Sequence, residues 1–249
     1  MRKTARIALR LGAGIVSLVV LVGVVVLLGR GGSPTSPPPP TVRLAGVDIS
    51  SHNHPIPWSA AADSGVRFVI ARATEGASRV DERYSSVKEQ ARAAGLAFTA
   101  FHFARPDPTR DDALREADAF LEAAGLGPGD LVPVLDLEEA GRLGVRALQA
   151  WATIWLDVVG ATLGVRPLIY TNANFWRVHM GDSTAFADAG YRLYIASWGA
   201  ASPVVPAANW GGRGWALWQT SSCGKVRGIP GCVDTDLYNG ADLRPVTIP

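Results

Sequence analysis

From residue 44 onward, short apolar runs alternate along the chain with longer amphipathic stretches. Eight of the runs have the length and the β-branched and aromatic content of strands, and they cover residues 44–49, 66–72, 96–103, 131–138, 166–171, 191–197, 214–219 and 232–238. Several early runs are apolar almost throughout, as expected for parallel strands that are covered on both faces. Alternation of such strands with helices indicates the α/β class.

Three amphipathic stretches predict helices between the early strands, over residues 81–94, 110–124 and 146–163. Each is followed directly by a glycine, which is a common residue just beyond a helix C-terminus. Helices between the first five strands favour a β/α barrel. The spacers after residue 171 are irregular, so we expect a distorted, flattened barrel. An open doubly wound sheet is the alternative, although no glycine-rich phosphate loop follows the first strand.

The first 43 residues differ in charge from the rest of the chain. They hold six of the 24 basic residues and none of the 22 acidic ones, so the remainder carries 18 basic against 22 acidic residues. This mildly acidic balance gives no indication of nucleic-acid binding.

Residues 11–29 form an uncharged apolar run of 19 residues, long enough to span a bilayer and preceded by four basic residues. We expect residues 1–30 to be a cytoplasmic stub and a transmembrane signal-anchor helix, 31–42 a Pro-rich linker, and 43–249 the folded domain. This places the protein in the cell membrane as a single-pass protein with an extracytoplasmic domain. Cleavage of the segment as a signal, followed by secretion, is the alternative.

The chain has two cysteines, Cys223 and Cys232, with eight residues between them. Because both lie in the part expected to be exported, we predict that they form a disulfide bond, against the alternative of two unrelated thiols. Zinc is not expected there, since neither a CxxC motif nor a nearby histidine is present.

Acidic residues gather at predicted strand ends. Asp136 and Glu138 close the run 131–138 and, as residues i and i+2 of a strand, should face the same way, about 7 Å apart. Mutual repulsion should raise one pKa, so that one group remains protonated as a general acid. Asp48 ends the first strand, while Asp234 and Asp236 lie on the last. Acidic residues that cap helices are the alternative, but burying this many carboxylates is costly unless they serve a function.

Aromatic and amide side chains lie near the same strand ends, namely Phe103, Tyr170, Trp198, Trp218 and Gln219. Flat aromatic rings suit sugar rings, and amides suit sugar hydroxyls. The motif His52-Asn53-His54 after the first strand is the competing feature, because HxH at this point can mark a metal-dependent hydrolase. No histidine occurs between His102 and His179 to complete such a site, so neither a metal nor another cofactor is expected.

Eight stretches together resemble glycoside hydrolase family 25, the Chalaropsis-type lysozymes. In chain order they are GVDISSHN (46–53), FVIARATEG (68–76), FHFARP (101–106), PVLDLE (133–138), LIYTN (168–172), LYIASWG (193–199), WALWQTSS (215–222) and GCVDTDLYNG (231–240). No single stretch is specific for this family, but the occurrence of all eight in the family's order along nearly the whole domain is specific. Phe101, where the family often has Tyr, and the loop between the cysteines are the departures.

The resemblance implies a flattened barrel that cleaves the β-1,4 bond between N-acetylmuramic acid and N-acetylglucosamine in peptidoglycan, with retention of configuration. It makes Glu138 the proton donor, Asp136 either the nucleophile or the helper of the substrate acetamido group, and Asp48 and Asp234 further catalytic acids. The expected substrate-binding residues are Phe103, Tyr170, Trp198, Gln219 and Asp236. The expected partner is the glycan strand, bound by a monomer. A non-catalytic wall-binding module and a metal-dependent amidase or deacetylase are the alternatives.

Overall fold

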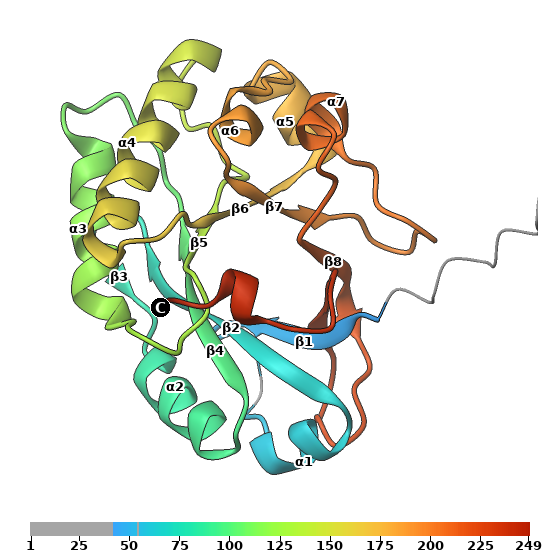
Figure 1. Ribbon diagram of the computed structural model, residues 1–249. Coiled ribbons are helices and arrows are strands. Elements are labelled where there is room, and N and C mark those ends of the chain that lie inside the picture. The colour runs from blue at the N-terminus through green and yellow to red at the C-terminus, as the bar shows by residue number, and fades with distance from the viewer. Residues whose placement is uncertain (1–41, 54) are drawn as a thin grey trace, which may run out of the picture. The chain divides into compact units, whose positions relative to one another are not determined.

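The computed structural model describes residues 42–53 and 55–249 (Figure 1), which form an eight-stranded β/α barrel. The ring runs β1 (Leu44–Ile49), β2 (Val66–Glu75), β4 (Ala97–Phe103), β5 (Val134–Asp136), β6 (Leu168–Asn172), β7 (Arg192–Ala196), β8 (Leu217–Gly224) and β9 (Val233–Tyr238). It closes because β1 pairs with both β2 and β9. A two-residue strand, β3 (Arg79–Val80), extends β2. The predicted barrel is therefore confirmed.

Neighbouring strands of the ring are parallel, except that β9 is antiparallel to both β8 and β1. This reversal brings the beginning of β9 to the edge where the other strands end. All eight predicted strands are present, but the run 131–138 forms a strand only over Val134–Asp136. Leu131 makes an isolated bridge to Thr247 instead, and Glu138 lies just beyond the strand.

Helices surround the ring: α1 (Trp58–Asp63), α2 (Tyr84–Ala93), α3 (Asp112–Ala124), α4 (Val145–Leu163), α5 (Ala173–His179), α6 (Ala185–Asp188), α7 (Pro206–Gly211) and the 3-10 turn η1 (Arg244–Val246). The three predicted helices correspond to α2, α3 and α4. Gly125 and Gly164 end α3 and α4 with φ of 51° and 68°, a conformation that glycine adopts without strain. The irregular spacers after residue 171 contain short helices of seven, four and six residues.

Two apolar cores result. The larger lies between the barrel and the helices and includes the α4 stripe with Trp151 and Trp155. The smaller fills the barrel and includes Phe68, whose ring occupies the space where a Cβ on Gly46 would lie, 2.2 Å from the nearest ring carbon. Glycine at position 46 thus allows β1 to pass over a buried aromatic ring.

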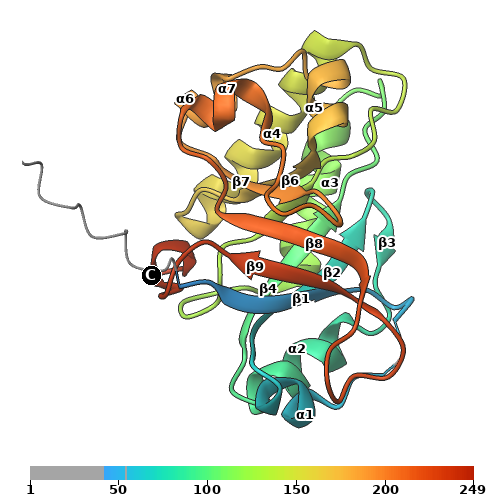
Figure 2. The same ribbon diagram turned by 90° about the vertical axis from the view of Figure 1, so that its right-hand side faces the viewer.

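The C-terminal segment closes the end of the barrel where the parallel strands begin. Val132 N donates to Val246 O at 2.8 Å, and Ile248 N donates to Asp130 O at 2.7 Å. Val246 and Ile248 join the core inside the barrel. In Figure 2 the C-terminus lies at one end of the barrel, while β3 lies at the other. The cleft described below opens at this second end.

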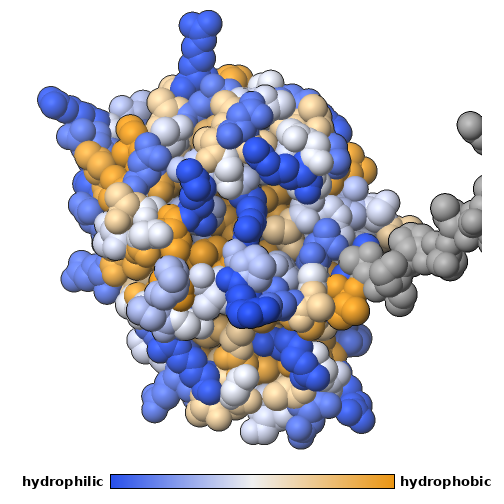
Figure 3. Space-filling view, in the orientation of Figure 1, coloured by the Kyte–Doolittle hydropathy of each residue, from blue (hydrophilic) through white to orange (hydrophobic). Residues whose placement is uncertain are grey.

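The face that Figure 3 shows mixes hydrophilic and hydrophobic side chains. Of the helices in residues 42–53 and 55–249, none is long and apolar enough to cross a membrane. The predicted membrane-spanning run 11–29, and the predicted linker 31–42 apart from its last residue, lie outside the described residues.

Candidate active site

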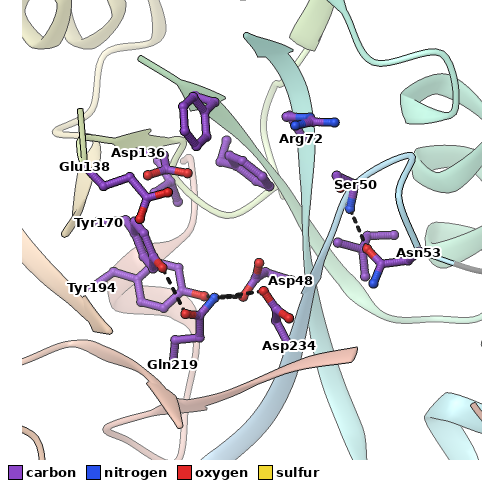
Figure 4. Close-up of a pocket in the computed structure, with 14 residues that line it drawn as sticks. Asp48, Ser50, Asn53, Arg72, Asp136, Glu138, Tyr170, Tyr194, Gln219 and Asp234 are labelled. Atoms are coloured by element: carbon purple, nitrogen blue, oxygen red, sulfur yellow. Dashed lines mark hydrogen bonds between the residues drawn. The ribbon is translucent and has the colours of Figure 1, made fainter. Parts of the chain in front are cut away.

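A cleft opens at the carboxyl ends of the parallel strands, where barrel active sites form. Its cavity volume is about 180 Å³. Fourteen residues line it (Figure 4): Asp48, Ile49, Ser50, Asn53, Arg72, Phe101, Phe103, Val134, Asp136, Glu138, Tyr170, Tyr194, Gln219 and Asp234. The predicted acids Asp48, Asp136, Glu138 and Asp234 are thus together in one cleft.

Asp136 and Glu138 occupy one side of the cleft (Figure 4). Asp136 is the last residue of β5 and is buried, and its Oδ1 makes no hydrogen bond within the described structure. Burial, followed by the charges of Glu138 and Asp48, raises the pKa of Asp136 well above its usual value. Glu138 is partly exposed, and burial together with the charges of Glu139 and Asp48 raises its pKa. The pair can therefore hold a proton at a pH where an isolated carboxyl group has lost it, which leaves one group as an acid while the other is ionised.

Asp48 lies across the cleft at the end of β1. Its Oδ2 accepts hydrogen bonds from Tyr194 Oη at 2.8 Å and from Gln219 Nε2 at 2.7 Å. Burial raises the pKa of Asp48, and these two donors lower it in part. Two donors on one oxygen favour the ionised carboxylate, so Asp48 is suited to carry the negative charge of this cluster.

Asp234 and Asp236 come from the beginning of β9. Asp234 lines the cleft, and burial together with the charge of Asp48 raises its pKa to about 8. Asp236 is only 2% exposed and lies below the cleft surface, with Oδ1 2.6 Å from Tyr194 Oη. Burial and the charge of Asp48 raise the pKa of Asp236 well above its usual value. Asp48 therefore lies next to two carboxyl groups that tend to stay neutral.

The other predicted site residues take different positions. Phe103 and Tyr170 line the cleft, while Trp198 is 58% exposed in the loop after β7. Gln219 lines the cleft with little exposed surface, and its amide is engaged by Tyr170, Trp198, Asp48 and Asp234. Trp218 is its neighbour on β8 and so points the opposite way, into the outer core. We therefore do not assign Trp218 to the cleft.

The sequence analysis missed Tyr194, which connects Asp48 with Asp236. A tyrosine in the middle of a buried strand requires a partner for its hydroxyl, and that signal could have identified it. Tyr170 and Tyr194 are register partners on β6 and β7, with ring centroids 4.8 Å apart. The Tyr194 hydroxyl donates to Asp48, whereas the Tyr170 hydroxyl donates to the amide oxygen of Gln219.

Arg72, on β2, lines the cleft, and Arg105 follows β4 nearby. Arg72 Nε donates to Asp81 Oδ2 at 3.1 Å, and Arg105 NH2 donates to Glu75 Oε1 at 2.7 Å. Arg105 also pairs with Glu139 and lies over the ring of Phe103, 4.5 Å from its centroid. The positive charge of Arg105 partly opposes the rise in the pKa of Glu138.

The remaining predicted features lie outside the acid cluster. His52 Nδ1 is 3.1 Å from Ser50 Oγ and 3.3 Å from Arg72 NH2, and His54 is outside the described residues. His102, on β4, is buried on the side of the strand away from the cleft. Its ring lies between Thr74 and Glu116 and stacks on Trp155. Cys223 and Cys232 form the predicted disulfide at the β8–β9 loop.

A closed β/α barrel with several carboxyl groups of raised pKa in the cleft at the carboxyl ends of its strands has the arrangement of a barrel hydrolase. The profile of "Glycosyl hydrolases family 25" matches residues 47–229. This chain belongs to that family and is a glycoside hydrolase.

The chain is similar to proteins named as lysozymes and muramidases. Lysozyme M1 of Streptomyces globisporus is 32% identical over 90% of this chain and 78% of its own length. The N,O-diacetylmuramidase of Chalaropsis sp is 32% identical over 72% of this chain and 88% of its own. Among solved structures, the bacterial lysozyme from Streptomyces coelicolor gives a TM-score of 0.75 at 30% identity, covering 82% of this chain and 95% of that one. The family 25 lysozyme from Aspergillus fumigatus gives a TM-score of 0.75 at 29% sequence identity, covering 84% of this chain and 100% of that one.

Proposed function

We propose that this protein is a lysozyme that hydrolyses the β-1,4 bond between N-acetylmuramic acid and N-acetylglucosamine in peptidoglycan, with retention of configuration. The names of its relatives support the substrate class. The single observation that carries the mechanism is the pair Asp136 and Glu138 on one side of the cleft, each with a raised pKa.

In this proposal Glu138 protonates the leaving-group oxygen. Both residues line the cleft, but Glu138 is partly exposed whereas Asp136 is buried, so Glu138 is better able to reach a glycosidic oxygen. Its raised pKa keeps it protonated at higher pH than an ordinary glutamate. After bond cleavage the same group, now ionised, takes a proton from the attacking water, as retention requires.

Asp136 acts from below the sugar, either as the nucleophile or as the acceptor that orients the substrate acetamido group for attack. Its Oδ1 makes no hydrogen bond within the described structure, so no protein group competes with either role. Asp48 supplies negative charge opposite the developing oxocarbenium ion, and Asp234 shares its surroundings. Phe103, Tyr170 and Trp198 offer aromatic surface to the sugars.

Mass spectrometry of muropeptides released from purified peptidoglycan tests the proposal. Fragments with N-acetylmuramic acid at the reducing end are expected, and excess chelator should not reduce their yield. N-acetylglucosamine at the reducing end would contradict the assigned bond. If only peptide or acetate is released, an amidase or a deacetylase is correct. Binding without any release would support the non-catalytic wall-binding module.

We further propose a single-pass membrane location, with residues 1–30 as stub and anchor, 31–42 as linker and the barrel, as a monomer, outside the cytoplasm. The apolar run and its basic flank support the anchor. The folded domain begins at the start of β1, at the end of the barrel opposite to the cleft. Cell fractionation with N-terminal sequencing tests this. A soluble extracellular form beginning near residue 32 would show cleavage instead.

A further inference from the structure

We infer that Gln219 is a positioning residue, whose side-chain amide holds Trp198 at the rim of the cleft and the carboxyl groups of Asp48 and Asp234 at its floor in one fixed arrangement. The inference rests on the proposed function, because it assigns a role within the same cleft. It gives Gln219 a task other than the direct sugar contact that the sequence indicated.

The chemistry of its neighbours fixes the orientation of the amide. Gln219 Oε1 lies 2.8 Å from Trp198 Nε1 and 2.9 Å from Tyr170 Oη. An indole N–H can only donate, so the amide atom that faces it must be the carbonyl oxygen. Gln219 Nε2 must then face the opposite side, where both of its neighbours are carboxylate oxygens.

Those neighbours belong to the first and the last strands of the barrel. Gln219 Nε2 donates to Asp48 Oδ2 at 2.7 Å and to Asp234 Oδ2 at 3.2 Å. With two bonds accepted and two donated, the amide has used its whole hydrogen-bonding capacity. A sugar hydroxyl could bind to Gln219 only by displacing one of these partners. The residue is therefore built to hold protein groups in place.

The arrangement matters most for Trp198. Its ring is 58% exposed, and an exposed side chain is ordinarily free to change rotamer. The hydrogen bond from its indole N–H to Gln219 fixes the edge of the ring and leaves a face open to solvent. A sugar that stacks on this ring meets a surface already ordered, and the same amide transmits any displacement of the ring to Asp48.

The amide also affects proton binding at the floor of the cleft. Asp48 is faced by Gln219 from β8, Tyr194 from β7, and Asp234 and Asp236 from β9. Asp136 and Glu138 lie across the cleft, and the positive charges that act on them are Arg72 on β2 and Arg105 after β4. Gln219 supplies one of the two donors on Asp48 Oδ2, and loss of a donor makes the ionised carboxylate less favourable.

Three variants test the inference. Gln219→Leu keeps the approximate volume and removes all four hydrogen bonds. Gln219→Glu keeps an acceptor for Trp198 but places a third carboxyl group beside Asp48 and Asp234. Gln149→Leu is the matched control, because Gln149 donates to Met180 O on the outside of the barrel and lies away from the cleft.

Gln219→Leu should lower kcat/KM on peptidoglycan by about 10- to 100-fold, the effect of losing a hydrogen bond to a charged group. It should also raise KM and move the acid limb of the pH profile to higher pH. Gln219→Glu should approach wild-type activity at low pH, where a protonated Glu replaces the amide donor, and lose activity as pH rises. If both variants lose activity equally at every pH, or if Gln219→Leu keeps the wild-type pH profile and KM, the inference is wrong.

A second measurement does not depend on activity. In ¹⁵N–¹H spectra of the indole groups, the signal that disappears in Trp198→Phe belongs to Trp198. In Gln219→Leu this signal should shift and its proton should exchange faster with solvent, while Gln149→Leu leaves it unchanged. An unshifted, equally protected signal would overturn the inference. A protein that releases no muropeptides but shows the expected change would refute the proposed function and support the positioning role.

Discussion

Asp48 and Asp234 are direct partners in the antiparallel ladder between β1 and β9, although they come from the first and the last strands of the barrel. Carboxylates in such opposed positions repel each other. Burial and the charge of Asp48 raise the pKa of Asp234 to about 8. The native fold thus maintains an unfavourable pair, as expected where stability is lost to a functional site.

Asp234→Asn should therefore stabilise the protein at neutral and alkaline pH. Native Asp234 keeps its proton up to a pH of about 8, whereas the unfolded chain loses it near the usual aspartate pKa of 3.8. Between these values the native state binds more protons, so wild-type stability falls as pH rises. Asn does not titrate and avoids this loss. Because Asp234 is partly exposed, we expect a gain of only about 1–3 kcal/mol at pH 8.

Urea denaturation of Asp234→Asn at pH 4 and pH 8 measures the effect. Asp118→Asn, on the exposed face of α3, is the matched control and should follow the wild type at both values. The free energies of unfolding of the wild type and of Asp234→Asn should differ more at pH 8 than at pH 4. A constant difference would contradict the raised pKa. Activity of Asp234→Asn should fall at the same time.

Glu138→Gln should retain the fold and lower kcat by about 10²–10⁴-fold, the usual contribution of a general acid. Hydrolysis of purified peptidoglycan measures it, with circular dichroism as the check on folding. Glu122→Gln, at an exposed position of α3 away from the cleft, is the control. A loss of less than about tenfold in Glu138→Gln would remove Glu138 from the role of proton donor.

Glu139→Gln should change the pH dependence of activity. The negative charge of Glu139 is among the causes that raise the pKa of Glu138. Without it, Glu138 loses its proton at a lower pH, so the alkaline limb of the kcat profile should move to lower pH. Release of Arg105 from Glu139 should act in the same direction, since Arg105 favours the ionised form of Glu138. An alkaline limb that stays in place or moves upward would argue against this coupling.

The sequence predicted the barrel well because its strands are apolar runs and its major helices end at glycine. It predicted less of the second half. Helix α5 begins with Asn172 accepting from Phe175 N, a capping interaction too short-ranged to stand out in an irregular spacer. Strand β5 was predicted too long, because Leu131 and Val132 are apolar for contact with the C-terminal segment and not for pairing along the ring.

Strand alternation brought the acids together as predicted, since Asp136, Asp48 and Asp234 needed only the correct faces of three strands. Alternation alone could not show how far below the cleft surface each side chain lies. Asp234 and Asp236 share a face, yet Asp236 is one pleat deeper and contacts Tyr194 below the cleft. The partners of Gln219 come from three strands and a loop, and only the closed barrel brings them within hydrogen-bonding distance.

Cys223→Ser should lower the free energy of unfolding by about 1–3 kcal/mol, because the disulfide closes a short loop and restricts the unfolded chain modestly. The loop also packs on α1, where Gly228 approaches Ala60. Thermal denaturation with and without reductant measures the effect. Reductant should destabilise the wild type to the level of the variant and leave the variant unchanged, whereas two reactive thiols in the native protein would refute the bond.

Helix α7 offers the last prediction, because it is a left-handed turn. Residues 207–210 have φ between 51° and 56°, which costs residues other than glycine roughly 1–2 kcal/mol each. Burial of Trp210 and a hydrogen bond from Ala207 N to Asp182 Oδ1 at 2.7 Å offset this strain. Ala208 is exposed, so Ala208→Gly should relieve strain without loss of packing and stabilise the protein by about 0.5–1 kcal/mol. Ala150→Gly, the same change at an exposed position of the right-handed helix α4, should destabilise it by about 1 kcal/mol. Urea denaturation of the two variants should give opposite signs, and destabilisation by both would show that residue 208 is not left-handed in solution.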